Sequence, residues 1–130
     1  MDQATLVGPD LSVGRKILSV LDDAQIKKIT ALFVLFPDYS DWRLVLSSPS
    51  LDQNHPLRAG MKVHEILHGK FNNALPNLMI LPAKDSFIHD LRKYLNTFRA
   101  GSSYIRIGGQ TFGKRYVTDA FIIRLPGVIG

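Results

Sequence analysis

The sequence predicts an α+β domain in which helices pack on a mixed or antiparallel sheet of about five strands. Apolar residues at helical spacing alternate along the chain with short runs of strand-forming residues. One run, residues 29–36 (ITALFVLF), is almost entirely apolar, which is typical of a strand covered on both faces. The predicted order is α-β-β-α-β-α-β-β, in a single domain that spans residues 1–130.

The first three elements lie in residues 10–47. Asp10 or Ser12 can cap a helix that runs to about Leu21. The run 29–36 follows as a strand, and the turn cluster 37–41 joins it in a hairpin to a second strand, residues 42–47. In this second strand one face is apolar and the other is predicted to be wetter: Trp42, Leu44 and Leu46 against Arg43, Val45 and Ser47.

The second half begins with a helix predicted over residues 57–75, after Pro56 in its first turn. Its expected buried face is Leu57, Met61, Leu67, Phe71 and Leu75. A strand over 78–81 leads to a helix over 85–98, whose inward residues are Phe87, Ile88, Leu91, Leu95 and Phe98. Strands over 104–107 and 117–125 complete the sheet.

Composition limits the class of protein. Of 130 residues, 45% are hydrophobic and 21% are charged, which fits one folded domain. The absence of cysteine excludes disulfides, thiolate nucleophiles and cysteine-based metal sites. Residues 1–10 lack the pattern of a signal peptide, and the longest apolar run is too short for a bilayer. We therefore expect a soluble cytoplasmic protein with no membrane partner.

His64-Glu65-Ile66-Leu67-His68 is a complete H-E-x-x-H pattern within the helix predicted over 57–75. Residues four apart share one face of a helix, so His64 and His68 could both bind one zinc ion. Glu65 could then polarise a metal-bound water as the general base. Both histidines fall within the expected apolar face. The alternative is that they are helix-face histidines near the edge of the core, each with a hydrogen-bond partner.

A catalytic zinc site also needs a third protein ligand. Glu65 is the only glutamate in the chain, and the longer pattern with a nearby third histidine is absent. The remaining candidates are His55, Asp85, His89 and Asp90. His89 is predicted to point towards solvent, away from the apolar face of its helix. The sequence therefore favours a protein that is not an enzyme, and zinc binding by His64 and His68 is kept as an alternative.

Residues 108–114 satisfy G-x-x-x-x-G-K, the pattern of a phosphate-binding loop. Arg115 stands where a magnesium-binding Ser or Thr belongs, and a strand follows instead of a helix. A glycine-rich hairpin connection explains this stretch better. Lys114 and Arg115 remain candidates for contact with an anion or a nucleic acid.

The net charge of +5 makes nucleic acid a candidate partner. The basic residues are scattered, and their densest pairs fall on different predicted elements: Lys27-Lys28, Arg92-Lys93 and Lys114-Arg115. No helix-turn-helix, zinc-finger or RNA-binding strand pattern is present. A solvated, mildly basic surface is therefore the favoured interpretation.

Two segments carry a resemblance: residues 41–49 (DWRLVLSSP) and residues 116–125 (YVTDAFIIRL). They resemble a loose set of small bacterial α+β proteins of unassigned function. The likeness extends from about Leu18 onward and implies the fold alone. That set has polar residues where this chain has H-E-x-x-H, so the resemblance does not imply a metalloenzyme.

We therefore expect a non-catalytic interaction or accessory module that works through a protein partner or self-association. Exposed sheet edges and the apolar tail 126–130 are its expected contact surfaces. Two alternatives stay open. One is a minimal zinc hydrolase with His64 and His68 as ligands and Glu65 as base, and the other is a basic nucleic-acid-binding protein.

Overall fold

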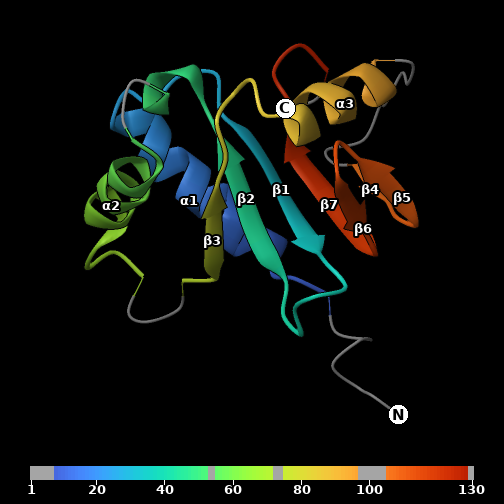
Figure 1. Ribbon diagram of the computed structural model, residues 1–130. Helices are drawn as coiled ribbons and strands as arrows, with labels where there is room; N and C mark the ends of the chain where they lie inside the picture. The colour runs from blue at the N-terminus through green and yellow to red at the C-terminus, as the bar shows by residue number, and fades with distance from the viewer. Residues whose placement is uncertain (1–7, 53–54, 72–74, 97–104, 129–130) are drawn as a thin grey trace.

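The computed structural model describes residues 8–52, 55–71, 75–96 and 105–128. A five-stranded sheet with the order β3-β2-β1-β7-β4 forms the middle layer (Figure 1). Helices α1 and α2 cover one face of this sheet, while α3 and a small hairpin, β5-β6, cover the other. The predicted α+β class and the order of elements are confirmed.

The sheet is mixed. Its strands, in chain order, are β1 (Thr30–Leu35), β2 (Arg43–Ser47), β3 (Asn77–Ile80), β4 (Ile105–Ile107) and β7 (Asp119–Arg124). The central strand β1 is antiparallel to β2 and to β7, whereas β2 and β3 are parallel. Because β1 has a neighbour on both sides and a covered layer on both faces, its residues are almost all buried.

On the first face lie α1 (Leu11–Asp23) and α2 (Pro56–Leu67). Asp10 is the N-cap of α1, as predicted, and its carboxylate accepts hydrogen bonds from the backbone amides of Ser12 and Val13. The core between these helices and the sheet is formed mainly by Ile17, Leu18, Leu21, Phe33, Leu44, Leu46, Val63, Leu67 and Ile123. Burial of these side chains fixes both helices on the sheet.

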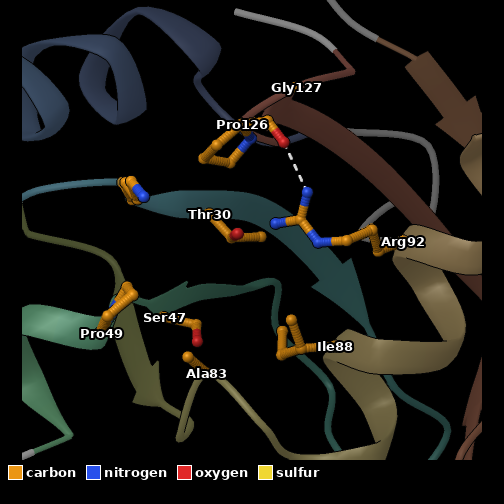
Figure 2. Close-up of a pocket in the computed structure, with 9 residues that line it drawn as sticks. Thr30, Ser47, Pro49, Ala83, Ile88, Arg92, Pro126 and Gly127 are labelled. Carbon is orange, nitrogen blue, oxygen red and sulfur yellow. Dashed lines mark hydrogen bonds between the residues drawn. The ribbon is translucent and has the colours of Figure 1, made fainter.

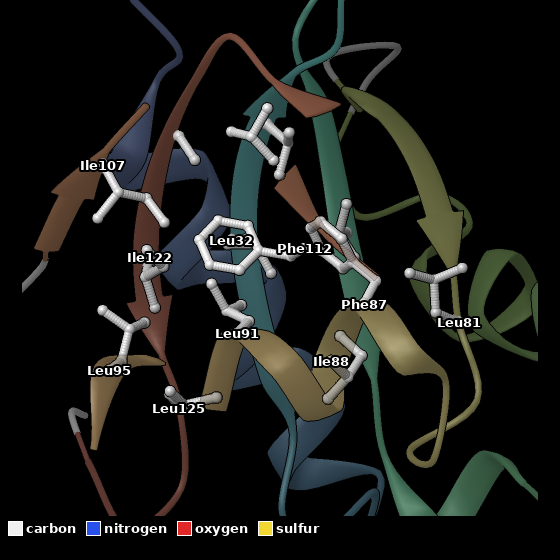
Figure 3. Packing of buried hydrophobic residues seen from close by; sticks show 14 of the residues in the cluster. Leu32, Leu81, Phe87, Ile88, Leu91, Leu95, Ile107, Phe112, Ile122 and Leu125 are labelled. Atoms are coloured by element: carbon white, nitrogen blue, oxygen red, sulfur yellow. The ribbon is translucent and has the colours of Figure 1, made fainter. Parts of the chain in front are cut away.

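On the second face lies α3 (Ser86–Leu95), together with β5 (Gln110–Phe112) and β6 (Arg115–Val117). The inward residues predicted for α3 are buried there, except Phe98, which lies outside the described residues. Figure 3 shows their side chains packed over β1 and β7, with Phe112 of the hairpin stacked in the same layer. The rings of Phe87 and Phe112 meet edge to face, with centroids 6.2 Å apart.

Three details of the prediction are wrong. The second face of β2 is not wetter, because α3 covers Val45 and Ser47. The helix predicted to reach residue 75 ends at Leu67. The last predicted strand begins with a separate hairpin, because β6 ends at Val117 before β7 starts.

The C-terminal tail also differs from the expectation of a free apolar contact segment. The carbonyl oxygen of Pro126 accepts a hydrogen bond from Arg92, and Val128 packs against the core of the second face. Residues 129–130 lie outside the described residues. The part of the tail that is described therefore helps to close the fold.

Candidate functional site

The H-E-x-x-H pattern lies at the C-terminal end of α2. Pro56 occupies the first turn, and His55 acts as the N-cap, with its Nδ1 accepting a hydrogen bond from the Leu57 amide at 3.3 Å. The chain leaves the helix at His68, and Gly69 follows in the left-handed region with φ of 78°. Of the pattern, His64 to Leu67 are therefore inside the helix, and His68 is its C-cap.

The buried side of α2 matches the prediction at Leu67 but not at Leu57 and Met61. Ala59, Val63 and Leu67 face the core, whereas Leu57 and Met61 are 69% and 62% exposed. Small and medium side chains allow α2 to pack closely against α1 and β3. The prediction failed at Leu57 and Met61 because it gave weight to the larger apolar residues and assumed a helix that continued beyond Leu67. Phe71 and Leu75, which lie past the end of α2, are partly buried against the core.

His64, Glu65 and His68 all lie on the exposed side of α2. Together with Arg58, Met61 and Lys62 they border an open hollow of about 790 Å³. We call this surface, with Leu57 added, the α2 outer face. The two imidazoles share one side of the helix, as the pattern requires, but neither lies near the edge of the core. Among the described residues, neither imidazole has a hydrogen-bond partner.

The candidates for a third zinc ligand are distributed elsewhere. His55 stands nine residues before His64, a separation of about 13 Å along a helix. The other candidates lie at α3, on the opposite face of the sheet. Asp85 caps that helix by accepting from the Phe87 amide at 2.9 Å, and Asp90 accepts from the Gly113 amide at 2.9 Å. His89 is exposed on α3, as predicted.

Within the described ranges, no three His, Asp or Glu side chains come together as a metal site requires. Two exposed imidazoles supply half of a tetrahedral zinc site, and a catalytic zinc normally has three protein ligands. The zinc alternative, with Glu65 as base, stays a prediction and gains no third ligand from the described geometry.

Lys114 lies in the turn of the β5-β6 hairpin and Arg115 is the first residue of β6, and both are exposed. The G-x-x-x-x-G-K pattern forms this hairpin, as predicted, and its Gly113 has φ of 61°. Since the Gly113 amide donates to Asp90, it is not directed at a ligand. Contact of Lys114 and Arg115 with an anion or a nucleic acid stays a prediction, which a loss of binding with added salt would test.

Comparison with protein-family models, with curated proteins and with solved structures gives no match for this chain. In the part of the chain that the structure describes, no helix is both long and apolar enough to cross a membrane.

Two residues of the α2 outer face, Leu57 and Met61, were predicted to be buried and are exposed. A signal for their exposure was present, because Ala59, Val63, Ile66 and Leu67 also follow helical spacing. If this second set of residues is the buried stripe of the helix, Leu57 and Met61 lie in solvent, one turn apart.

Proposed function

We propose that this protein is a non-catalytic interaction module of the cytoplasm, which binds an acidic, amphipathic segment of a partner protein on the α2 outer face. The observation that carries the proposal is the exposure of two large apolar side chains on one helix, next to basic groups. A chain without cysteine also fits a reducing compartment.

Leu57 and Met61 form the apolar part of the α2 outer face. They are the two most exposed of the large hydrophobic side chains in the described residues, at 69% and 62%. Their positions, four apart, put them side by side on the helix surface. Exposed apolar groups gathered in one place, with polar groups around them, are typical of protein contact sites. Methionine in particular adapts its shape to a partner.

The charges around these two residues favour an acidic partner. Arg58 and Lys62 carry permanent positive charges, and His64 and His68 add two imidazoles, against the single carboxylate of Glu65. Among the described residues, neither Arg58 nor Lys62 is held in an ion pair. A segment with apolar residues and carboxylates would therefore complement this face. Two copies meeting through this same face would bring like charges together, which argues against self-association here.

The sheet edges are weaker candidates. The edge strands β3 and β4 have four and three residues, and Pro76 and Pro82 flank β3. Short edges and nearby prolines are devices that limit the addition of a further strand.

The experiment compares three immobilised proteins: the wild type, Leu57→Ser/Met61→Ser and a matched control, Tyr116→Ser. Tyr116 is also an exposed large side chain, at 47%, but it lies on the hairpin on the other face of the sheet. Any protein retained from a cell lysate is then purified, and its affinity for each variant is measured directly. We expect the double variant to weaken binding by about tenfold or more, because apolar anchors dominate such interfaces.

A further variant, Arg58→Glu/Lys62→Glu, tests the charge argument and should weaken binding by a similar factor. Circular dichroism melts check that every variant stays folded. The proposal is contradicted if purified partners bind the double variant and the control equally well. It is also contradicted if the double variant retains every protein that the wild type retains. Sedimentation that reveals a dimer unaffected by these substitutions would point to self-association through another surface.

A further inference from the structure

A second cavity, of about 390 Å³, lies where β2 and β3 end (Figure 2). We call it the strand-end pocket. It is lined by Thr30 and Ser47 of the sheet, by Ile88 and Arg92 of α3, and by Lys28 and Pro126. In sheets with parallel strands, ligands commonly bind beyond the carboxyl ends of the strands. The volume also falls within the range of about 300–1,000 Å³ that is usual for small-molecule sites.

Two hydroxyl groups that line the pocket have no hydrogen-bond partner among the described residues. Thr30 and Ser47 stand opposite each other in the β1-β2 pairing, and they are only 3% and 2% exposed. Both belong to the face of the sheet that α3 covers, and both line the pocket. Neither side-chain hydroxyl has a hydrogen bond to any described residue. Buried hydroxyls are normally paired, so these two provide hydrogen-bonding capacity for a polar group inside the pocket.

The electrostatic character of the pocket is positive. The guanidinium of Arg92 donates to the carbonyl oxygen of Pro126, and Figure 2 shows it between Pro126 and Thr30. Lys28 adds a second cation, and no carboxylate is among the described residues that line the pocket. A guanidinium has five N–H donors, so the bond to Pro126 leaves others for a ligand.

Two hydrogen bonds of Lys27 fix the backbone next to Lys28. The Lys27 amide donates to the Ser50 hydroxyl at 3.1 Å, and the Lys27 carbonyl accepts from the Ser48 hydroxyl. Lys28 itself has a φ of 52°, in the left-handed region. The backbone on this side of the pocket is therefore held in place before any ligand binds.

From these observations we propose that the strand-end pocket binds a small organic anion. Its carboxylate or phosphate group lies against Arg92 and Lys28 and accepts hydrogen bonds from Thr30 and Ser47, and its apolar part contacts Ile88. Planar bidentate pairing with arginine suits both kinds of anion. The pocket and the α2 outer face lie on opposite faces of the sheet, so this proposal is independent of the proposed partner binding.

The experiment follows backbone amide resonances of ¹⁵N-labelled full-length protein during titration with two probes, inorganic phosphate and benzoate. We expect saturable shifts confined to amides around the pocket. The probe that binds more tightly shows whether the natural ligand carries a phosphate or a carboxylate. Arg92→Gln should weaken binding by about tenfold or more, because it removes a charge-assisted hydrogen bond. The matched control is Lys93→Gln, since Lys93 is the next residue on α3 and is exposed outside the pocket.

Arg92→Gln also removes the bond to Pro126, so two further variants keep the result interpretable. Lys28→Gln leaves that bond intact, and Thr30→Val removes a hydroxyl that lines the pocket with little change in volume. Each should weaken binding while the melting temperature stays close to that of the wild type. The proposal is overturned if neither probe gives saturable shifts at the pocket. It is equally overturned if Lys93→Gln weakens binding as much as Arg92→Gln and Lys28→Gln do.

Discussion

Gly14 of α1 lies directly against Phe33 of β1. A Cβ atom built on Gly14 would stand 2.7 Å from Cε2 of Phe33 and 2.6 Å from Cδ1 of Ile123. Phe33 is 2% exposed and enclosed on every side, so its ring has little room to move. The close approach of α1 to the sheet therefore depends on the missing side chain at Gly14.

We predict that Gly14→Ala destabilises the protein. The overpacking costs about 1–3 kcal/mol, which outweighs the gain in helix propensity of up to about 1 kcal/mol. The matched control is Gly60→Ala on α2, where a Cβ would meet nothing within 4 Å. That variant should instead gain about 0.5–1 kcal/mol. Urea denaturation measures both, and equal effects at the two positions would contradict the packing described for α1.

Asp90 joins α3 to the β5-β6 hairpin through its hydrogen bond with the Gly113 amide, at 2.9 Å. Asp90→Ala leaves that amide without its partner, so we expect a loss of about 1–3 kcal/mol. Faster hydrogen exchange in β5 and β6 should accompany the loss. The neighbouring exposed residue provides the control, His89→Ala, which should stay within about 0.5 kcal/mol of the wild type. Unchanged hydrogen exchange in β5 and β6 of Asp90→Ala would show that this bond does not hold the hairpin against α3.

Asp10 makes the stability of α1 depend on pH. The pKa of Asp10 lies below its ordinary value of 3.8, chiefly because the Ser12 hydroxyl donates to its carboxylate, with smaller effects from the amides of Val13 and Ser12. Because the pKa of Asp10 is lower in the folded than in the unfolded protein, its ionised carboxylate stabilises the folded state above pH 3.8. This stabilisation is lost as the pH falls through the folded-state pKa.

Asp10→Ala should therefore be less stable than the wild type at pH 7, and the difference should shrink as the pH falls below 3.8 and through the lowered pKa of Asp10. Denaturation curves of both proteins at a series of pH values measure this. A difference that stays constant down to pH 2 would mean that the charged cap contributes nothing.

Ser48 connects the end of β2 to the segment before β1. Its side chain is fully buried, donates to the Lys27 carbonyl and accepts from the Ser50 amide at 3.1 Å. Ser48→Ala should cost about 1–3 kcal/mol. Ser40→Ala, at an exposed turn position, provides the comparison and should change stability by less than about 0.5 kcal/mol. Thermal melts of the two variants that coincide would refute this role for Ser48.

Local sequence patterns predicted most of the fold. The run 29–36 and the turn cluster 37–41 indicate the central hairpin, and Asp10 and Asp85 mark the starts of two helices. The prediction failed where long-range packing decides. Ser47 is buried in a pocket that α3, some 40 residues later, borders, and its polar side chain gives no local sign of that.

The candidate sites were predicted less well. The H-E-x-x-H pattern lies on α2 as predicted, but the side on which its residues lie depends on which apolar stripe of α2 fits against α1 and β3. The strand-end pocket combines residues from β1, β2 and α3. Because Thr30 and Arg92 are separated by 62 positions, no local sequence pattern predicts the pocket.

The central claim is that the α2 outer face is a contact surface and that H-E-x-x-H there is not a zinc centre. The most direct test is elemental analysis of untagged, desalted protein after exposure to zinc, beside His64→Ala/His68→Ala. We predict far less than one zinc per chain, with no difference between the two proteins, because the two exposed imidazoles have no third ligand near them among the described residues. Zinc near one per chain that is lost in the double variant would contradict this claim and favour the hydrolase.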